Sequence, residues 1–592
     1  MDDKRNLITA VLLSALILIG WSFVQDRFFP TPKPPVTKTV TAAPGATATV
    51  APASTAPVAV PGAPTSAPAA SSERRFPSVA AALAASPRLK IANAKVAGSI
   101  NLVGARIDDL TLVQYRETID KKSPPVRLFS PGGTAAAHFA EIGWTGNGVT
   151  VPGKATLWTA SGASLTPKTP VALTWANGTG QTFRIELSID DKYLITAKQT
   201  VANDAAAPVS VGSYALVNKL GVPTDPAEHD SWTIHIGPMG VFNGAAKDDY
   251  RINYTDLVEG DAGQTKFDST GGWIGFTAKY WLSAVIADPK DKIAAEYRVD
   301  ANKLFQTNFT RAAAVIEPGK SQIVTSRIFS GAKESDVLTD YQNRLAIPQL
   351  DRAIDWGWFY WFEKPIFALL DWLFGMVSNF GVAIMLLTLI IRGLMFPIAQ
   401  KQFHSMAQMR VVQPKMQAIQ EKYKDDKPRL QQELMGLYKQ EKINPLAGCL
   451  PIFLQIPIFY ALYKVLMLTI EMRHQPFVLW INDLSAPDPA KILNLFGYLN
   501  FDPPALLGIG VLAVLLGLTM FLQFKLNPAP ADPVQAQVFA IMPWMLMFVM
   551  APFAAGLLLY WITNNILTIA QQKWMYSRYP ALKQAAATPA KK

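Results

Sequence analysis

Apolar and polar positions divide the chain into two parts of different character. Across residues 87–347, apolar residues alternate with polar ones in short runs that Gly, Asn and Asp interrupt. The run Phe183–Ile189 shows this period of two, and the polar triplet Asp190–Lys192 follows it as a turn. A period of two is typical of strands that bury one face of a sheet. The pattern predicts that residues 87–347 form one large all-β sandwich domain.

Long apolar runs dominate the remainder. Leu7–Val24 has 18 uncharged residues, which matches a bilayer span, and no small-residue cleavage site closes it. We interpret residues 1–27 as an uncleaved signal anchor. A final apolar run of 33 residues, Val538–Ala570, is too long for one span, and Pro552 and Gly556 divide it. The pattern predicts an α-helical bundle of six spans, of which the other five cover residues 379–399, 446–468, 505–526, 537–553 and 555–572.

The segments between these regions differ in composition. Residues 28–86 are rich in Pro, Ala and Thr, which predicts an extended tether. Residues 348–378 mix aromatic residues with acids and a lysine, which is typical of an interfacial amphipathic helix; a connector packed on the β domain remains the alternative. Residues 400–443 show two apolar helix faces around an Asp-Asp-Lys-Pro turn, which predicts a helical hairpin. Residues 469–504 form the remaining loop.

The charge distribution predicts the topology. The formal net charge is +11; residues 400–443 hold nine Lys or Arg against five acids, and the tail 573–592 holds five against none. Lys and Arg concentrate on the cytoplasmic side of membranes, so we expect the hairpin and both termini in the cytoplasm and the β domain on the opposite side of the membrane. The same distribution argues against nucleic-acid recognition. The single cysteine, Cys449, excludes an intramolecular disulfide and a multi-cysteine metal site, and no cofactor is indicated.

Polar residues interrupt the apolar runs and form the candidate site. Arg392 lies within the second span, where an ionisable residue is costly and suggests function, although its side chain could also snorkel. Thr388 lies one turn earlier on the same helix face. We interpret Lys464, near the outer end of the third span, as snorkelling. Polar groups in hydrocarbon must face one another or water, which predicts a wet intramembrane groove. Its other lining residues are Gln455, Gln523, Trp561, Asn565 and Thr568.

Several long motifs accompany these features. They are TLIIRGLMFPIAQKQFHSMAQMRVVQPKMQAIQEKY (388–423), YKQEKINPLAGCLPIFLQIPIFYALY (438–463), PFVLWINDLSAPDP (476–489) and GLLLYWITNNILTIAQQ (556–572). With these motifs, the N-terminal anchor, the tether and the β domain, the chain closely resembles the YidC-type insertases of Gram-negative bacteria. Two departures stand out: many relatives have Tyr at the position of Trp561, and the segment 492–504 is longer than usual.

The resemblance implies a non-enzymatic chaperone that inserts, folds and assembles nascent proteins in the bacterial inner membrane, alone or with the Sec translocon. It implies that the β domain is a supersandwich of galactose-mutarotase-like shape. The hairpin, including Met409, Pro414 and Glu433, is implied to receive substrate and, weakly, the ribosome. Arg392 matches the characteristic groove arginine of the family. The implied groove or substrate contacts are Thr388, Gln455, Gln523, Trp561 and Thr568.

Two other functions remain as alternatives. A membrane transporter would also have a polar intramembrane cavity, but the chain shows no internal repeat and no acid on its predicted spans. A membrane-tethered carbohydrate-active domain could use Glu228, His229 and His235 as acid–base groups. A shared fold does not imply shared chemistry, so surface or loop roles for these three residues are favoured.

Overall fold

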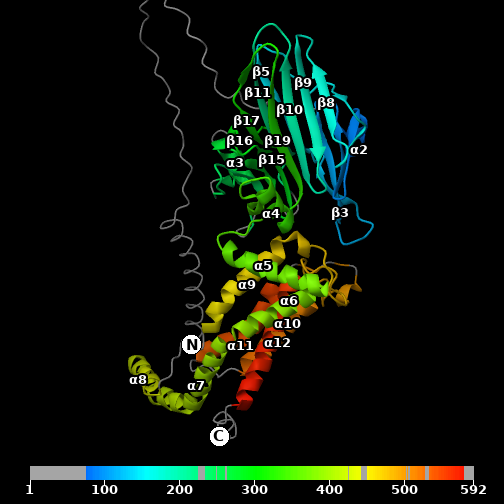
Figure 1. The fold of residues 1–592 in the computed structure, drawn as a ribbon. Coiled ribbons are helices and arrows are strands. Elements are labelled where there is room, and N and C mark those ends of the chain that lie inside the picture. Colours follow the sequence, from blue (N-terminus) through cyan, green and yellow to red (C-terminus); the bar gives the residue numbers. More distant parts are fainter. Residues whose placement is uncertain are drawn as a thin grey trace, which may run out of the picture. The chain divides into compact units, whose positions relative to one another are not determined.

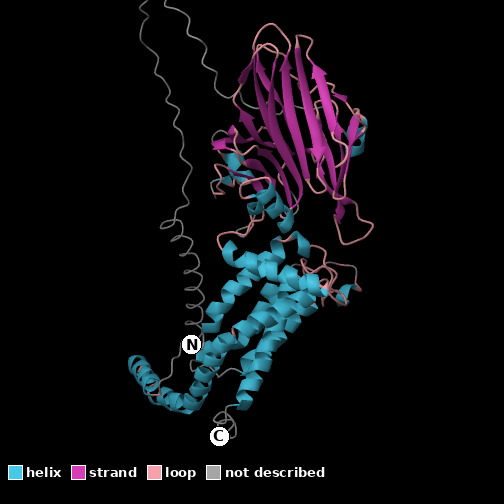
Figure 2. Ribbon diagram, viewed as in Figure 1, coloured by secondary structure: helices cyan, strands magenta, loops and turns pink. Residues whose placement is uncertain are grey.

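The computed structural model describes residues 75–223, 234–247, 250–260, 263–424, 426–441, 450–499, 501, 503–504, 507–526 and 533–578. The described residues fall into two compact units, a β unit up to residue 355 and a helical unit from residue 356. Figure 2 shows long strands in the first unit and helices in the second. The predicted anchor 1–27 lies outside the described residues, as do most of the tether and of the basic tail.

The β unit contains two extended sheets (Figure 1). The strands of the first sheet are β1 (Arg88–Ala92), β2 (Val96–Asn101), β3 (Arg106–Arg116), β4 (Pro125–Phe129), β5 (His138–Asn147), β7 (Ser164–Leu165), β11 (Val209–Leu220), β13 (Gln264–Thr270), β16 (Lys292–Val299), β17 (Leu304–Arg311) and β18 (Ala314–Ile316). Their order is β13-β16-β17-β11-β5-β3-β2-β1-β7, with β18 beside β11 and β4 beside β3.

The strands of the second sheet are β6 (Thr159–Ala160), β8 (Val171–Ala176), β9 (Gln181–Ile189), β10 (Leu194–Asn203), β12 (Gly237–Val241), β14 (Trp273–Thr277), β15 (Trp281–Ala287) and β19 (Lys320–Ala332). Their order is β12-β14-β15-β19-β10-β9-β8-β6. The large β-rich domain predicted from alternating residues is therefore confirmed. Short helices accompany the sheets: α2 (Val79–Ala84), α3 (Tyr254–Glu259), α4 (Ser335–Arg344) and a 3-10 turn, η3 (Leu350–Ala353).

The hairpin of β9 and β10 shows how the alternating pattern becomes structure. Phe183, Ile185, Leu187 and Ile189 are all buried, while the residues between them are partly or fully exposed. The two strands pair antiparallel from Ile189 opposite Ile195 to Gln181 opposite Asn203. One face of the hairpin can therefore be buried while the other remains polar, because successive side chains of a strand point to opposite faces.

The predicted tether ends too late. The backbone N–H of Phe76 donates to the carbonyl of Gly133 at 3.0 Å, and α2 begins at Val79 with a hydrogen bond from Ala81 N to the Ser78 hydroxyl. Serine is a favoured N-cap residue because its oxygen accepts from the free backbone donors of the first turn. The last residues of the segment 28–86 are therefore part of the folded β unit.

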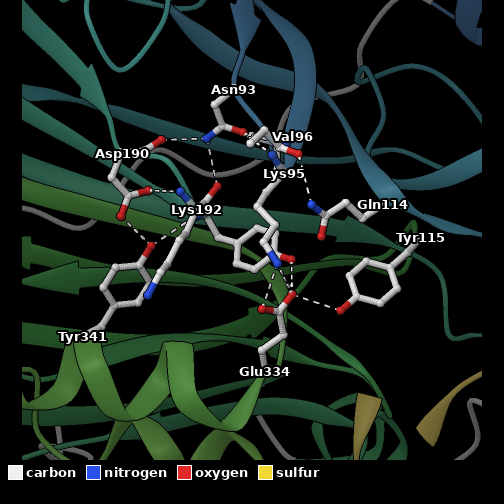
Figure 3. A network of polar contacts seen from close by, with 11 residues as sticks. Asn93, Lys95, Val96, Gln114, Tyr115, Asp190, Lys192, Glu334 and Tyr341 are labelled. Atoms are coloured by element: carbon white, nitrogen blue, oxygen red, sulfur yellow. Dashed lines mark hydrogen bonds and ion pairs between the residues drawn. The ribbon is translucent and has the colours of Figure 1, made fainter. Parts of the chain in front are cut away.

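A polar network ties α4 to both sheets of the β unit (Figure 3). The Glu334 carboxylate, directly before α4, pairs with Lys95 at 2.9 Å and accepts hydrogen bonds from the hydroxyls of Tyr115 and Tyr193. Tyr341 of α4 donates to Asp190 in the β9–β10 turn. Burial and the neighbouring Glu334 carboxylate raise the pKa of Tyr193, so its hydroxyl keeps its proton and acts as a donor.

The helical unit contains α5 (Tyr360–Val377), α6 (Phe380–Leu394), α7 (Phe396–Lys422), α8 (Lys427–Gln440), α9 (Leu450–Leu468), α10 (Val511–Leu526), α11 (Pro533–Met550) and α12 (Ala555–Arg578). Two 3-10 turns, η5 (Ile470–Met472) and η6 (Leu495–Gly497), lie between α9 and α10. Helix α12 packs against α10, α6 and α9, and α5 packs against α6 and α9. Helix α12 is thus the common neighbour of the helices that carry the candidate residues.

The described helices do not reproduce the predicted spans residue for residue. The predicted second span, 379–399, is divided, since α6 ends at Leu394 and α7 begins at Phe396 with Pro397 in its first turn. Helix α10 begins at Val511 rather than near residue 505. Among the described residues, no helix has both the length and the apolar character that a bilayer crossing requires. The number of six spans therefore stays a prediction.

The segment predicted as a hairpin forms two helices, α7 and α8, that pack against each other. Val412 and Met416 of α7 and Leu437 of α8 form the buried cluster between them, and Met409 lies against it. Asp426 caps α8, because its side chain accepts from Arg429 N at 3.1 Å. Pro428 suits the first turn of α8, since it lacks an N–H that would need a partner there.

We expect Glu334→Ala to loosen α4. The change leaves the Lys95 ammonium and two tyrosine hydroxyls without their acceptor, which costs about 1–3 kcal/mol for a partly buried group. Hydrogen exchange of α4 and β10 peptides in the full-length protein measures this loss as faster opening. Asp340→Ala on the same helix is the control, because its ion pairs are exposed and should matter little. Equal exchange in both variants would contradict the proposed role of the network.

Candidate functional site

Arg392 lies in the last turn of α6 and is held by α12. Its Nε donates to the amide oxygen of Asn564 at 2.7 Å. Thr388, one turn earlier on α6, is buried, and its hydroxyl donates to the carbonyl of Ile384 at 2.7 Å. The threonine therefore satisfies its own hydroxyl within the helix, and α12 supplies the partner of the arginine.

Asn564, the partner of this arginine, shares one face of α12 with residues spaced from it by four. Tyr560, Asn564 and Thr568 are all buried, and the hydroxyl of Thr568 donates to the carbonyl of Asn564 at 2.6 Å. The amide of Gln455 on α9 donates to the hydroxyl oxygen of Tyr560. Tyr560 also lies close enough to Arg392 for an electrostatic interaction. A chain of polar groups thus links α9, α12 and α6.

The remaining predicted groove residues lie in a second neighbourhood. Asn565 donates from Nδ2 to the hydroxyl of Thr519 on α10 at 3.2 Å. The ring of Trp561 lies 5.0 Å from that of Phe459 on α9. Gln523 is half-buried one turn after Thr519. The described hydrogen bond of Arg392 therefore goes to Asn564, whereas Asn565 and Trp561 contact α10 and α9.

The sequence analysis did not include Tyr560, Thr519 or Asn564 among the groove residues. The available signal was the spacing of Tyr560, Asn564 and Thr568, which places the three side chains nearly above one another on a helix. Trp561, Asn565 and Thr568 satisfy a similar spacing one position away. A single sequence does not show which of these two faces of α12 contacts the neighbouring helices, because it does not determine the rotation of α12 about its own axis.

The positive charge of Arg392 lies among apolar helices that carry no acidic residue in their described lengths. Helices α6, α9, α10, α11 and α12 contain no Asp or Glu in their described lengths. A guanidinium group has five N–H donors, and the described hydrogen bond of Arg392 uses only Nε. The terminal nitrogens can therefore offer charge-assisted hydrogen bonds to a carboxylate or carbonyl oxygen of a guest.

Lys464 does not snorkel, and that interpretation was wrong. Its side chain on α9 is only 2% exposed. Gly357 is a close neighbour of its ammonium group, since a Cβ added at Gly357 would lie 3.9 Å from the Lys464 Nζ. Glu363 in the first turn of α5 is 0% exposed, and α5 packs against α9. Both charged side chains are therefore enclosed by protein. Charged groups are buried in this way only where the surrounding structure compensates their charge.

The residues proposed for carbohydrate chemistry are not assembled in the described part of the chain. Glu228 and His229 lie outside the described residues. The backbone N–H of His235 donates to the Asp355 carboxylate at 2.8 Å, and its ring Nε2 lies 3.0 Å from the carbonyl of Pro238. These contacts give His235 a structural role in the β unit.

Two family models match the chain. Residues 88–369 match the model described as the YidC periplasmic domain, and residues 372–583 match the 60Kd inner membrane protein model. The β-rich part and the helical part of the fold therefore each correspond to a part of the same kind of protein.

Relatives of known name match over nearly the full length. The chain is 46% identical to the membrane protein insertase YidC of Zymomonas mobilis, covering 98% of this chain and 96% of the relative. It is 45% identical to the membrane protein insertase YidC of Rhizobium meliloti, covering 97% and 95%. The chain belongs to the YidC family of inner-membrane protein insertases. Members of this family are insertases rather than enzymes.

Solved structures also resemble the chain. A crystal structure of an active YidC insertase with its first transmembrane domain resolved covers 83% of this chain and 93% of that chain at 18% identity, with a TM-score of 0.36. A galactose mutarotase related enzyme from Lactobacillus acidophilus covers 41% and 97% at 11% identity, with a TM-score of 0.29.

We expect Tyr560→Phe to destabilise the packing of α9 on α12. The change removes the acceptor of the Gln455 amide, and interhelical hydrogen bonds of this kind contribute about 0.6–1.7 kcal/mol. Thermal unfolding of the purified full-length protein in detergent measures the loss. In a double-mutant cycle with Gln455→Leu the two effects should be clearly non-additive, whereas additive effects would show that the two side chains do not interact.

Proposed function

We propose that this chain inserts membrane proteins by receiving their polar segments in a groove beside Arg392. The observation that carries the proposal is the hydrogen bond from Arg392 Nε to Asn564, which orients a cation without cancelling its charge. Gln455 of α9, Tyr560 and Asn564 of α12, and Arg392 of α6 extend the polar surface across three helices. Thr388, Gln523, Trp561, Asn565 and Thr568 are proposed as further groove or substrate contacts.

The groove lowers the cost of moving a polar tail into the bilayer. Each backbone or side-chain polar group that enters hydrocarbon without a partner costs several kcal/mol. A groove open to the cytoplasm keeps the tail hydrated over part of that path. Arg392 attracts acidic or carbonyl groups of the tail, while the apolar segment of the client leaves past Trp561 into lipid. No covalent bond is made or broken.

The proposed topology follows from charge. Six spans place both termini and the α7–α8 hairpin in the cytoplasm and the β unit in the periplasm, because Lys and Arg favour the cytoplasmic side. The membrane potential, positive outside, then favours outward release of acidic tails by about 2.3 kcal/mol per charge per 100 mV. Helices α6, α9, α10, α11 and α12 are the proposed spans among the described residues.

Partners of the proposed insertase are nascent membrane proteins, lipid, the Sec translocon and, weakly, the ribosome. The α7–α8 hairpin is the proposed receiver, because its helices pack through a small apolar cluster that includes Met409 and leave Pro414 and Glu433 exposed. A hairpin joined through so few buried side chains can open or move at low cost.

We expect Arg392→Ala to impair insertion of clients with acidic tails, and Arg392→Lys to retain most of it, because a lysine preserves the charge. The measurement is client insertion in cells depleted of the native protein. Lys525→Ala is a matched control, since that lysine is exposed at the end of α10. Normal insertion by Arg392→Ala would refute the role of the arginine.

We expect Asn564→Asp to distinguish the effect of the Arg392 charge on insertion from its effect on the stability of the protein. An aspartate can accept the same hydrogen bond and adds an ion pair, so thermal stability should be retained. The positive charge offered to a client is then largely neutralised, and insertion of acidic-tailed clients should fall while that of uncharged-tailed clients changes little. An equal loss for both client types would contradict the proposed role of the positive charge of Arg392.

A further inference from the structure

An exposed apolar tip projects from the connection between α9 and α10. The sequence from Ile492 to Phe501 contains no charged residue. Its described large apolar side chains are each at least 42% exposed, and Tyr498 reaches 90%. Exposed apolar patches of this kind mark interaction sites, because they cost free energy in water. The side chains concerned, here called the apolar tip, are Ile492, Leu493, Leu495, Phe496, Tyr498, Leu499 and Phe501.

A buried carboxylate fixes the base of the tip to α10. Asp488 is buried, and its Oδ1 accepts from Trp480 Nε1 and from Ala490 N, each at 3.0 Å. Its Oδ2 accepts from the backbone N–H of Leu512 in the first turn of α10 at 2.8 Å. The backbone N–H of Ile492 donates to the carbonyl of Ile509 at 3.0 Å. The tip therefore starts from a rigid base and not from a free loop.

The backbone of the tip is held in a conformation that bulky residues disfavour. Leu495 and Phe496 have φ angles of 50° and 60°, in the left-handed region. Hydrogen bonds from Phe496 N to Lys491 O at 2.8 Å and from Leu499 N to Asn494 O at 3.0 Å maintain this turn. Strained positions persist where the surroundings impose them, and they gather at functional segments. Here the turn leaves both apolar side chains in solvent.

We propose that the apolar tip inserts into the headgroup boundary of the outer lipid leaflet and anchors the α9–α10 connection there. The proposal rests on the proposed function, in which α9 and α10 cross the bilayer and their connection emerges at its outer surface. A segment that is rich in tyrosine, phenylalanine and leucine and has no charged residue suits this boundary. Leu515, Leu518 and Leu522 continue the exposed apolar surface along α10. A protein interface would more often combine aromatic residues with arginine, and the tip has none.

The test places a fluorescent label at the tip of the full-length protein. Tyr498→Cys in a Cys449→Ser background is labelled with a polarity-sensitive dye and reconstituted in phosphatidylethanolamine–phosphatidylglycerol vesicles. We expect lipids spin-labelled near the headgroup to quench the dye more than deeply labelled lipids, and aqueous iodide to have little access. Ile119→Cys, an exposed position of the β unit, provides the water-accessible reference, and Leu518→Cys provides the membrane reference.

Two results would overturn the proposal. The first is a dye at position 498 that iodide reaches as easily as at position 119, while position 518 is quenched by lipid. The second is shielding at position 498 that disappears when protein is diluted in lipid, because the occupant would then be a second copy of the chain. Absence of lipid quenching at position 518 would instead refute the proposed membrane function itself.

A charge at the tip supplies the second arm of the experiment. Phe496→Asp should abolish lipid quenching at position 498, because a carboxylate favours water over the acyl boundary. Ile323→Asp, at an exposed position of β19, should leave that quenching unchanged. Unchanged quenching in Phe496→Asp would show that the aromatic residue does not hold the tip in lipid.

Discussion

The helical unit depends on one requirement, which is that polar groups on apolar helices must find partners on neighbouring helices. Arg392 meets Asn564, Gln455 meets Tyr560, and Asn565 meets Thr519. Each of these contacts joins α12 to a different helix, so the polar side chains of α12 also determine which helices surround it. The proposed site for polar segments and the packing of the bundle therefore use the same residues.

The β unit is stabilised mainly by the burial of apolar side chains between its sheets. Its sheets bury alternate side chains, and that pattern was visible in runs such as Phe183–Ile189. The network around Glu334 was not predicted, since Lys95, Tyr115 and Tyr193 come from separate elements and meet only after the sheets have formed. Local alternation predicts strands, but it does not predict which distant polar residues will share one carboxylate.

The same limit explains what was and was not predictable in the helical unit. Apolar runs indicated helices, and the two apolar faces of 400–443 indicated the contact of Val412 and Met416 with Leu437. The residue types of the candidate site were also visible, because Arg, Asn and Gln are unusual in such runs. The partner of each was not, since adjacent positions such as Asn564 and Asn565 point to different neighbours. Lys464 shows the same difficulty, because its burial cannot be inferred from its own helix.

The choice of a neutral partner for Arg392 has a physical consequence for function. A carboxylate in the place of Asn564 would bind the guanidinium more tightly and would also cancel the charge that an acidic guest needs. An apolar residue would leave Nε without an acceptor and the side chain without a fixed direction. An amide oxygen satisfies one donor, fixes the orientation and leaves the net charge in place. Asparagine at position 564 therefore suits a site that must bind polar segments briefly and release them.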